Sequence, residues 1–410
     1  SEAYSILPGK RPSLDLIHRR MKKVTPLLRE RVVGLLLPLM LFIAALVGSV
    51  GVILPAAVLL LATRGHLLPV YRWIVDSCSF AWFTLSSALL EWLARVRVVV
   101  RGDGATRPTD ERVSIVICNH NSRLDWMFLW CLMARHRSCG RLKIALQEPL
   151  KAAGPFGWAM QAFLFIFLSR KDREADLQRL RAICAHASRH GPVSVLLFPE
   201  GTDFSDNALA KSDAYADAKG LPCYTRLLHP KTAGFVACVQ ALGERLDAVY
   251  DATVAYTPHP LAAAAADPRP SEHDFPRGTL PRTVLLDVRR VPRAALPAAS
   301  DEEGLARWLL ERWARKEELL VNGLAGEGGE GGEGGAAPAA LQLSIDPLVR
   351  MRELQLHLLR TSAVSDTAYE AFGTRLLGCV VDERPLGGAA DAPLRRATVT
   401  ALRTATPLRL

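Results

Sequence analysis

The amino-acid sequence predicts an α/β protein, with a mostly parallel sheet and flanking helices preceded by an N-terminal membrane segment or helical hairpin. Two observations lead to this prediction. Residues 32–63 contain no charged residue and no histidine, which is 32 consecutive positions. From 96 to about 290, short apolar β-branched runs alternate with stretches of helical periodicity. That alternation is typical of parallel sheets built from strand–helix–strand units.

The composition narrows the class of protein. The chain has 410 residues, of which 50% are hydrophobic and 22% are charged, so it can bury a core in two or three domains. Lysine and arginine outnumber the acids by 51 to 41, which suits anionic partners such as a membrane surface or a nucleic acid. The eight cysteines form no C-x-x-C pair. This argues against a disulfide scaffold, a zinc ribbon or a thioredoxin-like site.

Residues 32–63 are a candidate membrane segment. A single span needs about 20 apolar residues, and the apolar core of a secretory signal peptide is far shorter than this stretch. Gly48, Gly51 and Pro55 lie near its middle. Two interpretations remain open: one long tilted helix, or a helix that breaks near these residues, dips into the bilayer and returns.

A second, weaker apolar segment follows at 71–95. Arg72, Asp76 and Glu91 interrupt it, and three tryptophans, which favour the headgroup level, lie along it. We interpret it as an interfacial segment or the return arm of a hairpin; a buried helix of a soluble domain is the alternative. Residues 1–31 carry eight lysines and arginines against three acids, which predicts a cytosolic N-terminus. A hairpin would keep the following domain in the cytosol, whereas an odd number of crossings would place it in the lumen.

Strands and helices are expected to alternate along the next part of the chain. The candidate helices cover about 124–133, 172–189 and 300–320. Gly191 is a stop signal for the second, and Ser300 with Glu303 has capping-box spacing for the third. The candidate strands are short and almost continuously apolar, as in sheets buried on both faces. They are residues 96–100, 113–118, 164–168, 193–198, 248–255 and 284–288.

Six segments are expected along the chain, separated by changes in charge, periodicity and glycine content. A run rich in glycine and glutamate near residue 330 is typical of a flexible linker. In order, the segments are a basic N-terminal stretch (1–31), a membrane-embedded part (32–95), an α/β core (96–256), a C-terminal accessory part of the same unit (257–322), the linker (323–340) and a tail of unassigned role (341–410).

The pair His120 and Asp125 is the strongest chemical signal. His120 follows the strand 113–118, where α/β proteins place their sites, and Asp125 lies at the start of the next helix. An aspartate there can reach the imidazole, fix its tautomer and stabilise the imidazolium. Such a pair suits a general base acting on a substrate hydroxyl. The spacing alone is weak, because a core histidine capped by an aspartate has the same pattern.

Two further predicted strands also end in polar clusters. Arg170 follows the strand 164–168, and an arginine at a strand end suits a phosphate group. Glu200, Gly201 and Thr202 follow the strand 193–198, where a glycine permits close approach of a ligand to the backbone. Taken singly, each cluster is equally compatible with a tight turn or a solvated charge.

Taken together and in order, these motifs resemble the glycerolipid acyltransferase family, also called the 1-acylglycerol-3-phosphate acyltransferase superfamily. The resemblance covers about residues 30–320. Its motifs are Asn119-His120-x-x-x-x-Asp125, Phe165-x-x-x-Ser169-Arg170 and Phe198-Pro199-Glu200-Gly201-Thr202. Longer strings look like the lysocardiolipin and lysophosphatidylinositol acyltransferase branch: SRLDWMFLW (122–130), FGWAMQ (156–161), FPEGTDFSDN (198–207), LLHPKTAGF (227–235) and LDAVYDATVAY (246–256).

Three positions refine this resemblance. Asp203 supports the lysocardiolipin and lysophosphatidylinositol branch, since the plain lysophosphatidic acid enzymes more often have arginine there. Gln147 is a departure, because many relatives have lysine at that position, and it puts one headgroup contact in doubt. Gly154-Pro155 has the reverse of the expected order.

The resemblance implies a membrane-bound enzyme of phospholipid remodelling that moves a fatty acyl group from acyl-CoA to the free hydroxyl of a lysophospholipid. His120 would be the general base and Asp125 would orient it. No metal or cofactor is implied, and acyl-CoA is a substrate. The location implied is the endoplasmic reticulum membrane, with the catalytic domain facing the cytosol. The residues expected to bind substrate are Asn119, Arg123, Arg170, Glu200, Gly201 and Thr202.

Several other functions are weighed against this one. Synthesis of phosphatidic acid from lysophosphatidic acid is the alternative within the family. A non-catalytic lipid-binding or scaffold protein on the same fold is a second alternative. Nucleic-acid binding is supported by the positive charge alone. The basic stretch lies beside a membrane segment, so the positive-inside rule accounts for its charge. A serine hydrolase is disfavoured because the chain has no G-x-S-x-G motif.

Overall fold

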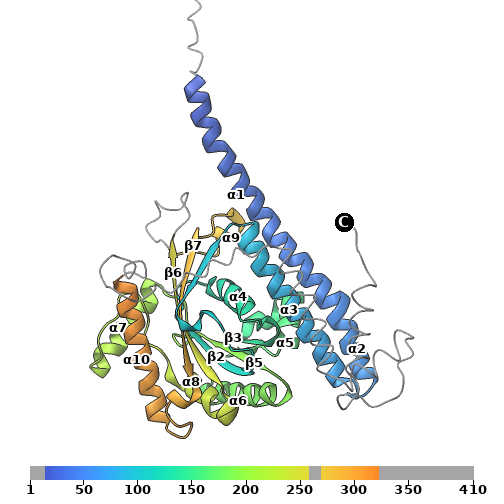
Figure 1. Ribbon diagram of the computed structural model, residues 1–410, viewed down its shortest axis with the longest axis vertical. Coiled ribbons are helices and arrows are strands. Elements are labelled where there is room, and N and C mark those ends of the chain that lie inside the picture. The colour runs from blue at the N-terminus through green and yellow to red at the C-terminus, as the bar shows by residue number, and fades with distance from the viewer. Residues whose placement is uncertain (1–13, 258–268, 323–410) are drawn as a thin grey trace, which may run out of the picture.

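The computed structural model describes residues 14–257 and 269–322. The expected linker (323–340) and tail (341–410) lie outside the described residues. The described chain forms a helical hairpin packed along one side of an α/β domain (Figure 1). This arrangement confirms the predicted fold class.

The sheet has seven strands in the order β1-β7-β6-β2-β5-β3-β4. All of its described strand pairs are parallel except β6–β7, which is antiparallel. Because the central strands are covered on both faces, they are almost wholly apolar. The strands are β1 (Arg97–Arg101), β2 (Val113–Cys118), β3 (Leu142–Gln147), β4 (Ile166–Leu168), β5 (Val193–Leu197), β6 (Ala248–Thr257) and β7 (Thr283–Pro292).

β3 is the strand that the sequence analysis missed. Its second residue is Lys143, which breaks the apolar pattern that identified the other strands. Lys143 is nevertheless buried, and its ammonium lies 3.7 Å from the carboxylate of Asp76 in the hairpin. A partner supplied by a distant segment therefore lets a lysine occupy a buried strand, and local sequence does not reveal that partner.

One detail at the C-terminal end of the domain differs from expectation. β7 contains the predicted strand 284–288 and lies between β1 and β6. The last helix, α10 (Glu302–Val321), is capped by Asp301, whose carboxylate accepts from the N–H of Gly304 at 2.8 Å, instead of by Ser300. The Asp side chain satisfies one of the free N–H groups at the helix start.

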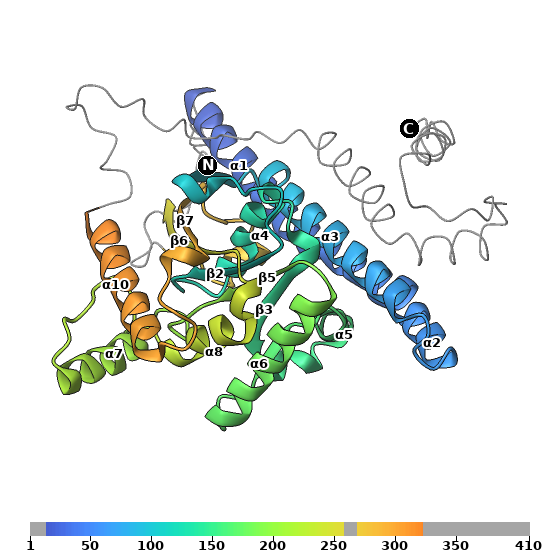
Figure 2. The same ribbon diagram turned by 60° about the horizontal axis from the view of Figure 1, so that its bottom comes forward.

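Helices cover both faces of the sheet (Figure 2). One face packs against α3 and α4, and its core is rich in aromatic side chains such as Phe83, Phe128 and Trp130. The other face packs against α6, α8 and α10, where Phe235 stacks on Trp308. The helices of the domain are α4 (Asp125–Arg135), α5 (Gly154–Ala162), α6 (Arg173–His190), α7 (Asp206–Lys219), α8 (Thr232–Leu242), α9 (Asp274–Arg277) and α10.

The hairpin consists of two long helical arms. The first runs through α1 (Leu14–Leu46), a π-helical turn (Val47–Ile53) and α2 (Leu54–Ala62). The glycines and the proline near its middle therefore widen the helix into a π turn but do not reverse the chain. The second arm, α3 (Leu68–Trp92), returns along the first, as the return-arm interpretation predicts.

Both arms of the hairpin have the length and apolarity of membrane spans. The apolar stretches are Leu27–Ala62 and Leu68–Trp92. Large apolar side chains remain exposed on the first arm, including Leu35 at 68% and Leu61 at 77%. Contiguous exposed apolar surface of this kind marks contact with a membrane or another apolar partner. The finding supports the expected membrane association.

The hairpin is attached to the domain by close backbone contacts. Gly34 in α1 packs directly against the last turn of α9 and the following Gly278, which has a positive φ of +70°. A Cβ on either glycine would overlap a main-chain carbonyl across this contact. Farther along, the hydroxyl of Ser49 in the π turn donates to the carbonyl of Pro155 in α5 at 2.9 Å. These two contacts, together with the Lys143–Asp76 pair, fix the position of the hairpin against the domain.

The first prediction concerns this glycine contact. Gly34→Ala should lower the free energy of unfolding by about 1–3 kcal/mol, because the new methyl group overlaps the carbonyl of Pro276. The measurement is the thermal unfolding midpoint of the detergent-solubilised protein. Gly48→Ala is the matched control, since a Cβ at Gly48 would meet no atom within 4 Å. Equal midpoints for the two variants would show that the contact is not tight.

Candidate active site

The polar motifs meet at the carboxyl edge of the sheet. β2, β5 and β6 are neighbouring parallel strands, so the residues that follow them share one edge. His120 follows β2, and Glu200 follows β5. Tyr256 lies near the end of β6. Residues separated by more than 130 positions in the chain are thereby brought into hydrogen-bonding contact.

His120 and Asp125 form a hydrogen-bonded pair. The imidazole Nδ1 lies 3.0 Å from Oδ2 of Asp125, and this carboxylate is fully buried. Asp125 is the first residue of α4, where the helix dipole favours negative charge. The imidazole is stacked on Phe198 with a centroid distance of 4.3 Å. Because Nδ1 is engaged, Nε2 is the nitrogen that is available to a substrate.

The Asp125 carboxylate is held by two further donors. The N–H of Ser122 donates to Oδ2 at 3.0 Å, and the hydroxyl of Tyr256 donates to Oδ1. Burial raises the pKa of Tyr256 well above its ordinary value, so this hydroxyl remains a donor. The sequence analysis missed Tyr256. Its signal was available, because it is the aromatic residue near the end of the strand next to β2.

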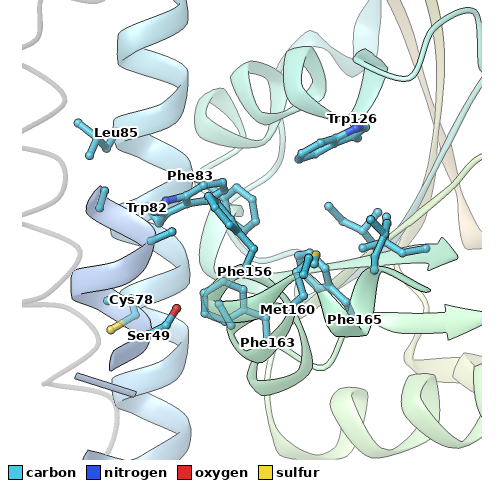
Figure 3. A pocket seen from close by; sticks show the side chains of 18 of the residues that line it. Ser49, Cys78, Trp82, Phe83, Leu85, Trp126, Phe156, Met160, Phe163 and Phe165 are labelled. Carbon is cyan, nitrogen blue, oxygen red and sulfur yellow. The ribbon is translucent and has the colours of Figure 1, made fainter. Parts of the chain in front are cut away.

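A cavity of about 1480 Å³ opens beside His120, between the hairpin and the domain. Its walls are mostly apolar and come from the end of α1, the π turn, α3, β3 and α5. Figure 3 shows Trp82 and Phe83 of α3 beside Phe156 of α5, with Met160 and Phe163 nearby; the rings of Trp82 and Phe156 meet edge to face, 6.2 Å apart between centroids. The polar end of the cavity is formed by His120, Arg123, Arg170, Thr202 and Asp203.

Arg170 is held at the cavity by a strained turn. Its φ is +60°, which is uncommon for a residue with a side chain. The carboxylate of Asp176 in α6 accepts from the N–H groups of Ser169 and Arg170, at 2.8 and 2.7 Å. These bonds stabilise the turn. Arg170 lines the cavity, and its contact with a phosphate stays a prediction.

Three of the predicted substrate-binding residues lie behind the cavity wall. Asn119 is fully buried, and its side-chain amide pairs with the main chain of Val254 at 2.8 and 3.1 Å. Gly201 has a φ of +77° and closes a turn onto the carbonyl of Phe198. Glu200 is also buried. None of the three is among the residues that line the cavity in the described part of the chain, so their contact with substrate stays a prediction.

Glu200 holds the backbone of His120. Its Oε1 accepts from the N–H of His120 at 3.2 Å and from the indole of Trp313 in α10 at 3.3 Å. Its Oε2 accepts from the N–H of Leu228 at 3.4 Å. Burial raises the pKa of Glu200 to about 8, although these three bonds oppose the shift. Glu200 thus links the last helix to the main chain of His120.

Comparisons with known proteins extend these observations. The Acyltransferase family model matches residues 97–257. Lysocardiolipin acyltransferase 1 from Danio rerio is 41% identical over 292 residues, which cover 70% of each chain. The chain belongs to the glycerolipid acyltransferase family. As a member of this family, the protein is an enzyme that transfers acyl groups.

Two other similar proteins differ in how closely they match this acyltransferase. Lysophosphatidylinositol acyltransferase 10 from Caenorhabditis elegans is 33% identical over 61% of this chain and 62% of its own. The crystal structure of the 1-acyl-sn-glycerophosphate (LPA) acyltransferase PlsC from Thermotoga maritima aligns with a TM-score of 0.42. It is 19% identical, over 71% of this chain and 98% of that chain.

Across residues 14–257 and 269–322, no group of three or more His, Cys, Asp or Glu side chains is placed to hold a metal ion.

The second prediction follows from the burial of Glu200. The folded protein keeps a proton on this carboxyl up to about pH 8, whereas the unfolded chain loses it near pH 4.5. Wild-type stability should therefore fall as the pH rises through this window, by up to about 1.4 kcal/mol for each pH unit. Glu200→Gln removes the titration, so the variant should gain stability relative to wild type between pH 5 and 8. Thermal unfolding midpoints measured across this range test the effect, and parallel profiles for both proteins would contradict it.

Proposed function

We propose that the protein is a membrane-bound acyl-CoA:lysophospholipid O-acyltransferase with His120 as the general base. The single observation that carries this proposal is the His120–Asp125 pair at the end of a cavity of about 1480 Å³ with mostly apolar walls. A fatty acyl chain needs a long apolar channel, and the reacting hydroxyl needs a base beside it. Both requirements meet at one place in this fold.

In the proposed reaction, Nε2 of His120 takes the proton from the free glycerol hydroxyl of the lysophospholipid. The oxygen attacks the carbonyl carbon of the acyl-CoA thioester and forms a tetrahedral intermediate. Collapse of this intermediate breaks the carbon–sulfur bond, and the proton passes from His120 to the departing thiolate of coenzyme A. Asp125 stabilises the imidazolium formed in between. The overall change is one new ester and one free thiol, with no metal or redox cofactor.

In this proposal, the hairpin holds the enzyme at a membrane. Both arms are long and apolar enough to enter the bilayer, and the cavity lies between the hairpin and the domain. We propose that lipid substrates reach His120 from the membrane surface. A hairpin returns the chain to its starting side, and the basic N-terminal stretch favours the cytosol. The catalytic domain would then face the cytosol, on a membrane that we take to be the endoplasmic reticulum.

The acceptor we favour is lysocardiolipin, lysophosphatidylinositol or a related lysophospholipid. The names of two similar proteins, lysocardiolipin acyltransferase 1 and lysophosphatidylinositol acyltransferase 10, support this class. Lysophosphatidic acid, giving phosphatidic acid, is the alternative. Gln147 lines the cavity, so the position at which this chain departs from many relatives is available to the lipid.

The third prediction tests the base. Membranes from cells that express the chain are incubated with labelled acyl-CoA and a panel of lysophospholipids. His120→Ala should lower acyl transfer by at least about 10²-fold, because general-base catalysis typically contributes 10²–10⁴-fold. The protein should remain in the membrane at wild-type level, since the hairpin is unchanged.

His186→Ala is the matched control for this experiment. His186 lies in α6, where its imidazole stacks on His190 at a centroid distance of 4.3 Å, and it does not line the described cavity. This variant should keep wild-type activity. Full activity of His120→Ala would refute the mechanism. No transfer by wild type to any acceptor, with the protein confirmed in the membrane, would favour a lipid-binding scaffold.

A further inference from the structure

Strand β6 extends past its neighbour β2 at the carboxyl edge of the sheet. The last paired position between the two strands is Ala252 opposite Cys118, whereas β6 continues to Thr257. On its other edge the ladder with β7 also continues, and Tyr256 pairs there with Val284. Tyr256 therefore stands on a regular strand, beside the loop that follows β2.

Two asparagines of that loop hold the extension of β6 in place. The amide oxygen of Asn119 accepts from the N–H of Val254 at 2.8 Å, and its amide N–H donates to the carbonyl of Val254 at 3.1 Å. The side chain of Asn121 donates to the same carbonyl at 3.2 Å. The ring of Tyr256 packs on Phe128 of α4 at a centroid distance of 5.5 Å. Both the backbone and the ring of Tyr256 are thus fixed, which directs its hydroxyl to one place.

That place is the oxygen of Asp125 that faces away from His120. The hydroxyl of Tyr256 donates to Oδ1, whereas Nδ1 of His120 and the N–H of Ser122 engage Oδ2. In the described part of the chain, Tyr256 is the single donor to Oδ1. Tyr256 is not among the described residues that line the cavity. It therefore acts on the site through Asp125 and not by touching a substrate.

A donor on the far oxygen weakens the hold of the carboxylate on a protonated imidazole. The carboxylate stabilises the imidazolium through its negative charge, and a hydrogen bond to the same carboxylate draws part of that charge away. One such bond has a larger effect inside a protein than in water, because the dielectric is lower. Burial and the charge of Asp125 raise the pKa of Tyr256 well above its ordinary value. The hydroxyl therefore stays a donor throughout the range in which an imidazole titrates.

Other ionisable groups surround the pair, and their effect is common to wild type and a Tyr256 variant. Burial raises the pKa of Cys118 well above its ordinary value, so this thiol stays neutral. In the described part of the chain, none of the surrounding groups donates a hydrogen bond to the carboxylate of Asp125. They are Cys118 at the end of β2, Glu200 behind the loop, Lys316 on α10, and Arg123, Arg170 and Asp203 at the polar end of the cavity.

We propose that Tyr256 is a positioning residue that sets the basicity of His120 through Asp125. Its hydroxyl holds the carboxylate in the orientation that meets Nδ1 and withdraws charge from it. The imidazole then takes up a proton less readily before substrate binds, so Nε2 is free to act as a base at neutral pH. This inference rests on the proposed function and adds to it a residue that does not touch the substrate.

The experiment measures two pH profiles of Tyr256→Phe. One is kcat/KM for acyl transfer, whose acid limb reports the ionisation of the base in the free enzyme. The other is the rate at which diethyl pyrocarbonate, which reacts with neutral imidazole, modifies His120, followed by mass spectrometry of its peptide. Both midpoints should move upward by about 0.5–1 pH unit, a three- to tenfold change in proton affinity. At pH 7, kcat should fall about three- to tenfold while KM stays within about twofold.

Tyr250→Phe is the matched control on the same strand. The hydroxyl of Tyr250 donates to the buried carboxylate of Glu111 at 2.5 Å, so the substitution removes the same kind of bond near the other end of β6. The thermal unfolding midpoint should fall in both variants, because each leaves a buried carboxylate with one donor fewer. Both pH midpoints of Tyr250→Phe should stay within about 0.2 unit of wild type.

A second background tests whether Tyr256 acts through Asp125. In Asp125→Asn, adding Tyr256→Phe should not move the modification midpoint, because the charge that the hydroxyl moderates is absent. Equal shifts in the two backgrounds would overturn the inference. So would unmoved midpoints in Tyr256→Phe, or an equal shift in Tyr250→Phe. Absence of acyl transfer by wild type would overturn the proposed function, and the modification midpoints would still decide whether Tyr256 acts on His120.

Discussion

The site depends on one buried charge, the carboxylate of Asp125. It is fully buried, yet three donors satisfy it: the imidazole of His120, the N–H of Ser122 and the hydroxyl of Tyr256. Removing a carboxylate from water is costly unless such partners replace the lost hydration. The donors come from the loop after β2 and from β6, so the carboxylate is satisfied only when these strands are neighbours. The fold and the geometry of the candidate site are therefore set by the same contacts.

A second buried carboxyl group, that of Glu200, supports the site from the other side of the loop. Glu200 receives hydrogen bonds from the main chain of His120 and the indole of Trp313. Asp125 thus orients the imidazole, and Glu200 positions the backbone that carries it. Trp313 belongs to α10, the last described helix, which packs on the face of the sheet opposite to α4. Elements on both faces of the sheet consequently act on one histidine.

The cavity is a product of the contact between the hairpin and the domain. Neither part encloses it alone, because its lining comes from α3 and the π turn on one side and from α5 and the strand ends on the other. The glycine contact at Gly34 and the Ser49–Pro155 hydrogen bond keep these two walls at a fixed separation. The same hairpin exposes its outer apolar surface. One structural unit therefore provides both an exposed apolar surface and a wall of the cavity.

The sequence by itself determined the fold class, most of the strands and the His120–Asp125 pair. These are local properties: apolar runs mark buried strands, and five-residue spacing across a strand–helix turn sets the pair. The tertiary structure decided the rest. Strand β3 was hidden because Lys143 finds its partner, Asp76, in the distant hairpin. Tyr256 and Trp313 reach the site only through packing between segments far apart in the chain. Asp203 lines the cavity, whereas Glu200 is buried behind its wall. The two residues belong to one sequence motif, and the motif does not show which side chain faces the cavity.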